Sequence, residues 1–141
     1  MPVIDANLVV AWLVPIDPSN PALAALDRMI ADEVEMLAPP LLVSEVCNAL
    51  LSGVRRGIWG GTTADKAVRH LDRLPISLQD HPKDLPRAWE LARRFDNHPI
   101  YDLLYVALAE RKGTTLITND LKLRRRLVGL DYVISPEDVL A

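Results

Sequence analysis

Apolar residues along the chain follow two alternating patterns. Short runs of apolar and β-branched residues, bounded by polar residues, proline or glycine, are typical of buried strands. Longer stretches repeat apolar residues three or four positions apart, which is typical of helices with one buried face. The predicted strands cover residues 3–5, 35–38, 74–78, 114–118 and 132–134.

Helices are predicted between these runs, with start and stop signals at several boundaries. Asn20 precedes Pro21, a pairing of a capping side chain with an early proline that favours a helix start. Gly57 and Gly113 follow helical stretches, as glycines do at helix ends. The predicted helices cover residues 19–30, 41–56, 62–71, 84–95, 100–112 and 121–127, with shorter helical segments at 7–13 and from 135.

The alternation of strands with helices predicts an α/β fold with a mostly parallel central sheet. Parallel strands are joined by right-handed crossovers, and ligands collect where the strands end. The chain has 141 residues, of which half are apolar and a quarter are charged. This length and composition predict a single globular domain over residues 1–141.

Four carboxylates are placed where this topology brings segments together. Asp5 ends the first strand, and Asp120 follows the strand at 114–118. Glu45 lies in the helix after the second strand, and Asp102 lies in the first turn of the helix before 114–118. All four are therefore expected at one edge of the sheet. Carboxylates that close together repel each other unless a divalent cation neutralises them, so the quartet predicts a metal site.

The chemistry of these ligands suits Mg²⁺ or Mn²⁺, because both ions prefer oxygen donors and no Cys/His cluster indicates zinc. Each acid also has an ordinary structural explanation. Asp5 could be a turn residue, Glu45 and Asp102 could complement a helix dipole, and Asp120 could cap the helix that follows it. Only the convergence of all four on one edge favours the metal site over these explanations.

Net charge and cysteine content bound the setting in which the protein acts. The formal charge of −3 argues weakly against a nucleic-acid partner, yet removing the four acids from that total leaves +1. Cys47 is the single cysteine, so no internal disulfide can form. No apolar run is long enough for a membrane span, and no secretory signal pattern opens the chain. A cytoplasmic protein is expected.

Three segments resemble the PIN-domain family, specifically the VapC-like ribonuclease toxins of toxin–antitoxin pairs. They are the opening stretch DANLVVAWLVP from Asp5, the stretch from Ala38 to Gly57 around Glu45, and the pair YDLLYVALAE and LITND between residues 101 and 120. The resemblance covers nearly the whole chain. It departs at Asn7, where many relatives have Ser or Thr, and at Leu103, where a small residue is common.

The resemblance implies a three-layer α/β/α sandwich and a Mg²⁺- or Mn²⁺-dependent endoribonuclease. Its implied partners are an RNA substrate, a small VapB-like antitoxin and a second copy in a homodimer. Asp5 and Asp102 are expected to bind metal directly. Glu45 and Asp120 are expected to complete the metal shell, to complete a second site or to orient the attacking water.

Other residues near the quartet have weaker assignments. Asn7 and Thr118 are candidates for hydrogen bonds to the metal ligands, although Thr118 could equally be an ordinary strand end. Lys122, Arg124 and Arg125 could contact RNA phosphates, although charge runs usually form solvated surfaces.

The histidines and tryptophans give no active-site pattern. His70, His81 and His98 are interpreted as surface or loop residues, and Cys47 as a packed residue. The tryptophans could stack bases, but packing is favoured for them, and the apolar stretch around Trp12 could line an antitoxin groove.

Three other functions remain open. A housekeeping PIN nuclease without antitoxin and a catalytically silent RNA- or protein-binding PIN module are the alternatives within the family. A nucleotide-binding module is disfavoured, because Gly60-Gly61 does not follow a strand as a phosphate loop requires.

Overall fold

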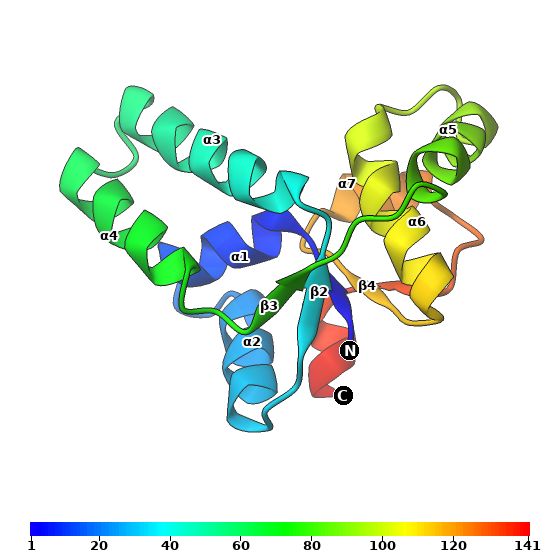
Figure 1. Cartoon of the computed structure of the whole chain (residues 1–141). Coiled ribbons are helices and arrows are strands. Elements are labelled where there is room, and N and C mark those ends of the chain that lie inside the picture. The colour runs from blue at the N-terminus through cyan, green and yellow to red at the C-terminus, as the bar shows by residue number, and fades with distance from the viewer.

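The computed structural model describes residues 1–141 and contains five strands in one sheet (Figure 1). The strands are β1 (Val3–Ile4), β2 (Met36–Ala38), β3 (Ile76–Leu78), β4 (Leu116–Ile117) and β5 (Val133–Ile134). They lie in the order β3-β2-β1-β4-β5, and every neighbouring pair is parallel. The predicted α/β class with a parallel central sheet is therefore confirmed.

Eight helices form the layers that flank the sheet. They are α1 (Ala6–Leu13), α2 (Pro21–Ala31), α3 (Leu41–Arg55), α4 (Gly61–Leu71), α5 (Asp84–Arg94), α6 (Ile100–Lys112), α7 (Leu121–Arg126) and α8 (Pro136–Leu140). Figure 1 shows α1, α3 and α4 on the left of the sheet, α5, α6 and α7 on the right, and α2 with α8 beneath. None of these helices combines the length and the apolar character needed to cross a membrane.

The observed strands are shorter than the predicted ones, but backbone hydrogen bonds between neighbouring segments continue beyond the strand ends. The strand expected at 114–118 is assigned only to Leu116–Ile117. The carbonyl of Thr115 still accepts a hydrogen bond from Val3 at 2.8 Å, and the N–H of Thr118 donates to Ile134 at 3.0 Å. The apolar pattern therefore marked the paired segment correctly, while its last residues turn away toward the next helix.

Helix α6 lies at the centre of the packing. Leu103 and all residues from 105 to 109 are buried, which makes this helix apolar around most of its circumference. A helix of that kind needs cover on several sides, and α6 has β1 and β4 on one side and α5 on another. Its position matters for function because its first turn carries Asp102.

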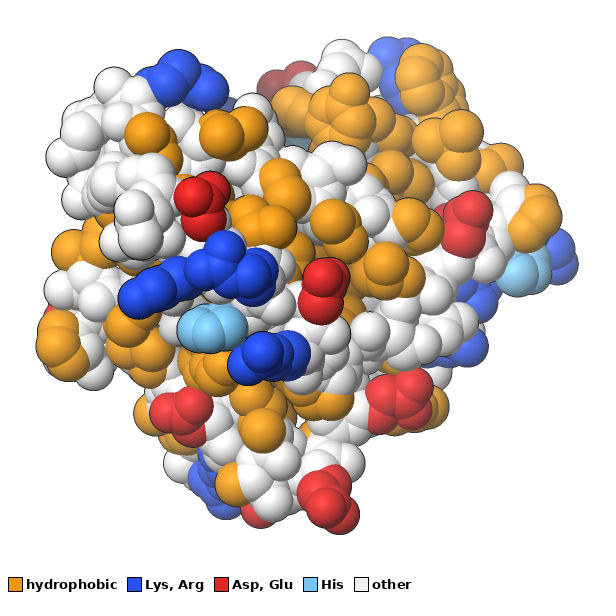
Figure 2. All heavy atoms as spheres, turned by 60° about the vertical axis from the view of Figure 1, so that its left-hand side comes forward, with side chains coloured by type: hydrophobic (Ala, Val, Ile, Leu, Met, Phe, Trp, Pro, Cys, Tyr) orange, Lys and Arg blue, Asp and Glu red, His pale blue; other side chains and the backbone are white.

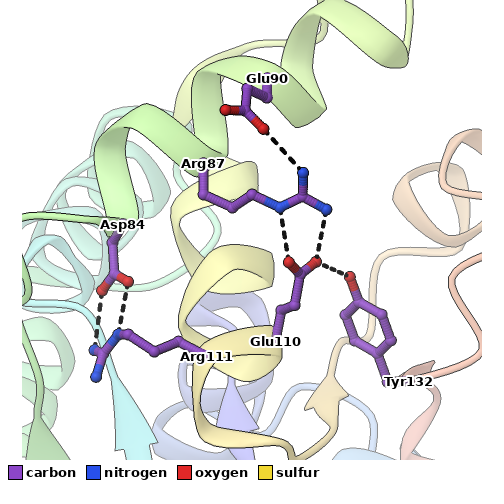
Figure 3. A network of polar contacts seen from close by, with 6 residues as sticks. All are labelled: Asp84, Arg87, Glu90, Glu110, Arg111 and Tyr132. Atoms are coloured by element: carbon purple, nitrogen blue, oxygen red, sulfur yellow. Dashed lines mark hydrogen bonds and ion pairs between the residues drawn. The ribbon is translucent and has the colours of Figure 1, made fainter.

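Two sets of charge-assisted hydrogen bonds hold α6 against α5 and β5 (Figure 3). Arg111 donates to both carboxylate oxygens of Asp84 at 2.7 and 3.0 Å. Arg87 donates to both oxygens of Glu110 at 2.7 and 3.2 Å, and the hydroxyl of Tyr132 donates to the same carboxylate at 3.0 Å. Because bidentate pairs restrict orientation as well as distance, they fix α6 relative to its neighbours.

On the other side of the molecule, α3 and α4 form a hairpin that is closed by Trp59. The indole N–H of Trp59 donates to the carbonyl of Leu50 at 2.9 Å. Its ring lies so close to Gly53 that a Cβ there would fall 2.1 Å from the Cε2 atom of the indole. Glycine is therefore required at position 53 for α4 to fold back along the helix that carries Glu45.

We expect Gly53→Ala to destabilise the protein by about 1–3 kcal/mol, since the added methyl displaces a packed ring and its hydrogen bond. Urea denaturation followed by circular dichroism measures this change. Gly61→Ala is the matched control, because a Cβ at Gly61 meets nothing within 4 Å. Equal stability of the two variants would contradict the packing argument.

Candidate functional site

The candidate site lies at the carboxyl edge of the sheet, where the direction of strand addition reverses. The chain adds β2 and β3 on one side of β1 and then returns to add β4 and β5 on the other side, so the direction reverses between β1 and β4. Open parallel sheets bind ligands at such a switch point. Asp5 directly follows β1, and Thr118 directly follows β4, so both residues stand at this point.

Asp5 occupies the N-cap position of α1, but its side chain does not cap the helix. Its carboxylate instead accepts a hydrogen bond from the hydroxyl of Thr118, with Oγ1 and Oδ2 2.6 Å apart. Asp5 is 7% exposed and Thr118 is fully buried. An acid at an N-cap usually satisfies the helix, so its use elsewhere indicates a different role for this carboxylate.

The electrostatic environment of Asp5 opposes its ionisation. Burial raises the pKa of the Asp5 carboxyl to about 6, and the negative charges of Asp102 and Glu45 act in the same direction. The hydrogen bond from Thr118 and the dipole of the nearby backbone N–H of Asn7 oppose this shift only in part. The ionised cluster is therefore costly in the absence of a cation.

Glu45 is held by a tyrosine that the sequence did not single out. The hydroxyl of Tyr105 on α6 donates to Oε1 of Glu45 on α3, at a distance of 2.6 Å. Burial raises the pKa of the Glu45 carboxyl, as does the charge of Asp102, while the hydrogen bond from Tyr105 lowers it. Burial also raises the pKa of Tyr105, which keeps its hydroxyl protonated as a donor to Glu45.

Asp102 is held by a histidine. Nε2 of His98 lies 2.7 Å from Oδ2 of Asp102, whose side chain is one-third exposed. His98 was predicted to be a surface or loop residue: it does belong to the loop between α5 and α6, but it is only 9% exposed and therefore not at the surface. A loop that packs back against a helix buried this side chain, and composition gave no sign of it. His70 is exposed, as predicted.

Asp120 makes one hydrogen bond that caps a helix and another that links it to the candidate site. Its Oδ1 accepts a hydrogen bond from the N–H of Leu123 at 3.1 Å, so it caps α7. Its own N–H donates to Oγ1 of Thr118 at 3.0 Å. The hydroxyl of Thr118 therefore bridges Asp5 and Asp120, and the predicted hydrogen bond from Thr118 to a quartet member is present.

The donor set suits a hard divalent cation, although no three His, Cys, Asp or Glu side chains already form a compact metal-binding group. Three of the acids, Asp5, Glu45 and Asp102, interact electrostatically. Each has a protein donor on one carboxylate oxygen, and the other oxygen has no such partner. Metal binding by the four acids thus stays a prediction, and the chemistry of the residues fits it.

A model of the PIN domain family matches residues 3–126 of the chain. The chain belongs to the PIN domain family. This PIN domain is 31% identical over 130 residues to Ribonuclease VapC3 of Pyrobaculum aerophilum, which covers 91% of this chain and 95% of that protein. It is 32% identical over 111 residues to VapC ribonuclease Mb0985 of Mycobacterium bovis, covering 74% and 84% of the two chains.

A solved structure supports the same fold. The crystal structure of PAE2754 from Pyrobaculum aerophilum matches this PIN domain with a TM-score of 0.72 at 24% identity, over 98% of this chain and 90% of that one. The predicted resemblance to VapC-like PIN domains and the predicted fold are both confirmed by these comparisons.

The three basic residues of this PIN domain that were predicted to contact RNA lie on α7, the helix that Asp120 caps. Lys122 and Arg125 are exposed on α7, and Arg124 is half-buried. The Nε atom of Arg124 is buried without a hydrogen-bond partner. These side chains start within two turns of Asp120 on the same helix.

The tryptophans are mainly packing residues, as predicted. Trp12 on α1 donates its indole N–H to Asp27 on α2 at 2.8 Å, and Trp59 closes the α3–α4 hairpin. Trp89 differs, since it is 64% exposed on α5. The predicted side-chain contact of Asn7 is not seen: Asn7 is exposed and lines a pocket of about 220 Å³ between α1 and the α3–α4 turn.

Asp5→Asn is expected to stabilise the metal-free protein at neutral pH. A raised carboxyl pKa means that the folded state keeps its proton to higher pH than the unfolded state. The stability this provides is present below about pH 4 and is lost as the pH rises through about 6. At pH 7 the variant should therefore exceed the wild type by up to about 3 kcal/mol in the free energy of unfolding, with little difference at pH 4.

Urea denaturation in EDTA at several pH values measures this difference. Asp32→Asn is the control, because Asp32 is exposed at the end of α2, away from the site. A wild-type protein that is the more stable of the two at pH 7 would contradict the electrostatic cost assigned to Asp5.

Proposed function

We propose that this PIN domain is a divalent-metal-dependent endoribonuclease toxin of the VapC type. The observation that carries the proposal is the crowding of Asp5, Glu45 and Asp102 at the switch point of the sheet, with two carboxyl pKa values raised. Proteins keep such an unfavourable cluster where it has a function. The names of two relatives, both ribonucleases, indicate which function to test.

Each acid has a role in this proposal. Asp5 and Asp102 hold the cation directly, and the hydroxyl of Thr118 orients Asp5. Glu45, fixed by Tyr105, orients the attacking water or completes a second site. When bound, Mg²⁺ or Mn²⁺ supplies positive charge that neutralises the phosphate and makes a coordinated water more acidic.

Asp120 and α7 serve the substrate side of the site. Asp120 completes the acidic edge through its link to Thr118. Lys122, Arg124 and Arg125 hold neighbouring phosphates of the RNA strand, while the acids and their cation act on the scissile one. In this arrangement the basic helix positions the RNA strand, and the acidic edge of the sheet carries out the cleavage.

Two protein partners complete the proposal. The pocket beside Asn7, lined also by Val10, Val14 and Trp59, accepts an apolar segment of a VapB-like antitoxin along α1, the helix that follows Asp5. Cys47 is a free thiol, which is compatible with the proposed action in a reducing cytoplasm.

We propose a homodimer because the protein exposes apolar surface that a second copy could cover. Figure 2 shows apolar side chains in a band across the upper part of the face it presents. Exposed apolar residues of α3, α4, β3 and α5 are Val43, Leu51, Val68, Leu78, Leu85 and Trp89. Patches of this kind favour a protein interface, and a monomer in sedimentation at micromolar concentration would contradict the dimer.

Asp5→Asn and Asp102→Asn are expected to lower RNA cleavage by about 100-fold or more, because each removes a charged ligand of the cation that neutralises the reacting phosphate. Cleavage of a labelled single-stranded RNA is measured with Mg²⁺, with Mn²⁺ and with EDTA. Asp32→Asn should cleave as the wild type does. Cleavage that persists in EDTA, or full activity of both site variants, would overturn the proposal.

Induction of the same proteins in growing cells separates the toxin from a housekeeping nuclease. Growth arrest by the wild type, with normal growth in Asp5→Asn cells, supports the toxin. Cleavage in vitro without growth arrest favours the housekeeping PIN nuclease, and RNA binding without any cleavage favours the silent module.

The phosphate contacts are tested by the salt dependence of RNA binding. In the Asp5→Asn background, replacing Arg124 and Arg125 by Ala should lower the slope of log Kd against log salt concentration by about 1.4, since each of the two lost phosphate contacts removes roughly 0.7 for single strands. Fluorescence anisotropy measures the slope, with Arg28→Ala on α2 as the control. An unchanged slope would rule out these contacts.

A further inference from the structure

His98 is a buried, hydrogen-bonded side chain whose role is not explained by packing alone. It stands four residues before Asp102, immediately before the proline that begins α6. Its Nε2 atom is 2.7 Å from Oδ2 of Asp102, and its side chain is 8% exposed while that of Asp102 is 33% exposed. The partly open carboxylate is thus held from its buried side.

The backbone that delivers His98 makes a left-handed turn. Asp96 and Asn97 have φ angles of 59° and 58°, a conformation that Asp and Asn adopt more readily than other residues with a side chain. The N–H of His98 donates to the carbonyls of Ala92 and Phe95, at 3.2 and 3.3 Å, which holds the turn against the end of α5. The turn and these two hydrogen bonds place His98 one helical turn before Asp102.

The hydrogen-bonding of the ring indicates which nitrogen carries the proton. Nδ1 of His98 is buried and has no partner, so a proton there would be an unsatisfied buried donor. An Nε2–H group, by contrast, points at a carboxylate oxygen that accepts it. The ring is therefore the tautomer that carries its proton on Nε2 and donates it to Asp102.

We propose that His98 is a positioning residue that fixes the orientation of the Asp102 carboxylate for metal binding. The proposal rests on the proposed function, in which Asp102 is a direct ligand. With Oδ2 held by the ring, the plane of the carboxylate is set, while Oδ1 has no protein donor. Partners that orient metal ligands in this way change metal affinity by about 10- to 100-fold when they are lost.

The experiment compares His98→Leu with His98→Gln. Leucine fills the buried volume without a donor, whereas the amide Nε2 of glutamine can reach Asp102 from nearly the same place. We expect Mn²⁺ affinity, measured by calorimetry, to fall about 10-fold in His98→Leu and to stay within about 3-fold of the wild type in His98→Gln. At a fixed subsaturating Mn²⁺ concentration, kcat for RNA cleavage should fall in His98→Leu while KM for RNA stays unchanged.

His81→Leu is the matched control. His81 is also a loop histidine that makes a local hydrogen bond, accepting from the N–H of Lys83 on Nδ1, but it contacts none of the four acids. Its replacement should leave Mn²⁺ affinity unchanged. Thermal unfolding in EDTA shows for each variant whether the metal-free fold is intact.

A second measurement does not depend on any variant of His98. Nitrogen-15 NMR of the metal-free wild type should show a proton on Nε2 of the His98 ring, and the signal of that group should shift in Asp102→Asn. These results support the proposal even if His98→Leu fails to fold. A ring without a proton on Nε2 would overturn it.

The outcomes separate the two proposals. If the wild type binds Mn²⁺ and cleaves RNA while folded His98→Leu binds Mn²⁺ equally well, the role of His98 is refuted and the proposed function stands. A His98→Gln variant as weak as His98→Leu also refutes it, since the donor is then not what matters. If the wild type neither binds Mn²⁺ nor cleaves RNA, both proposals fall.

Discussion

The cost of burying a carboxylate at the end of a central strand is the constraint around which this site is organised. Asp5 is 7% exposed, and burial together with two neighbouring acids raises its pKa to about 6. The fold tolerates this because Thr118, delivered by the adjacent parallel strand, donates a 2.6 Å hydrogen bond to Asp5. The pairing of β1 with β4 therefore does more than build the sheet, since it supplies the partner of the most buried acid.

The remaining acids depend on α6 in the same way. This helix brings Asp102 in its first turn and, one turn later, the tyrosine that holds Glu45 of α3. The ion pairs from Arg87 and Arg111 fix the opposite end of α6 (Figure 3), and buried apolar contacts hold its middle. A small sheet with strands of two or three residues can support an ordered site because its central helix is anchored along its full length.

Most of the fold could be predicted from the sequence, because local periodicity and helix boundaries agree with the tertiary arrangement. The positions of the four acids also followed, since parallel topology fixes which strand and helix ends share an edge. The residues that donate hydrogen bonds to these acids could not be predicted so readily. Tyr105 meets Glu45 across 60 positions in sequence, and its burial in an apolar helix resembles ordinary packing. His98 stands at an i, i+4 spacing from Asp102, a signal that was available, but its burial depends on how the preceding loop turns back.

Asp120 belongs to two parts of the molecule at once. One of its oxygens holds the first turn of α7, and its backbone N–H is bound to the hydroxyl that also supports Asp5. The position of this side chain therefore also affects the first turn of α7, the helix that carries Lys122, Arg124 and Arg125. The acidic edge and the basic helix are therefore linked through the hydrogen bonds of a single residue.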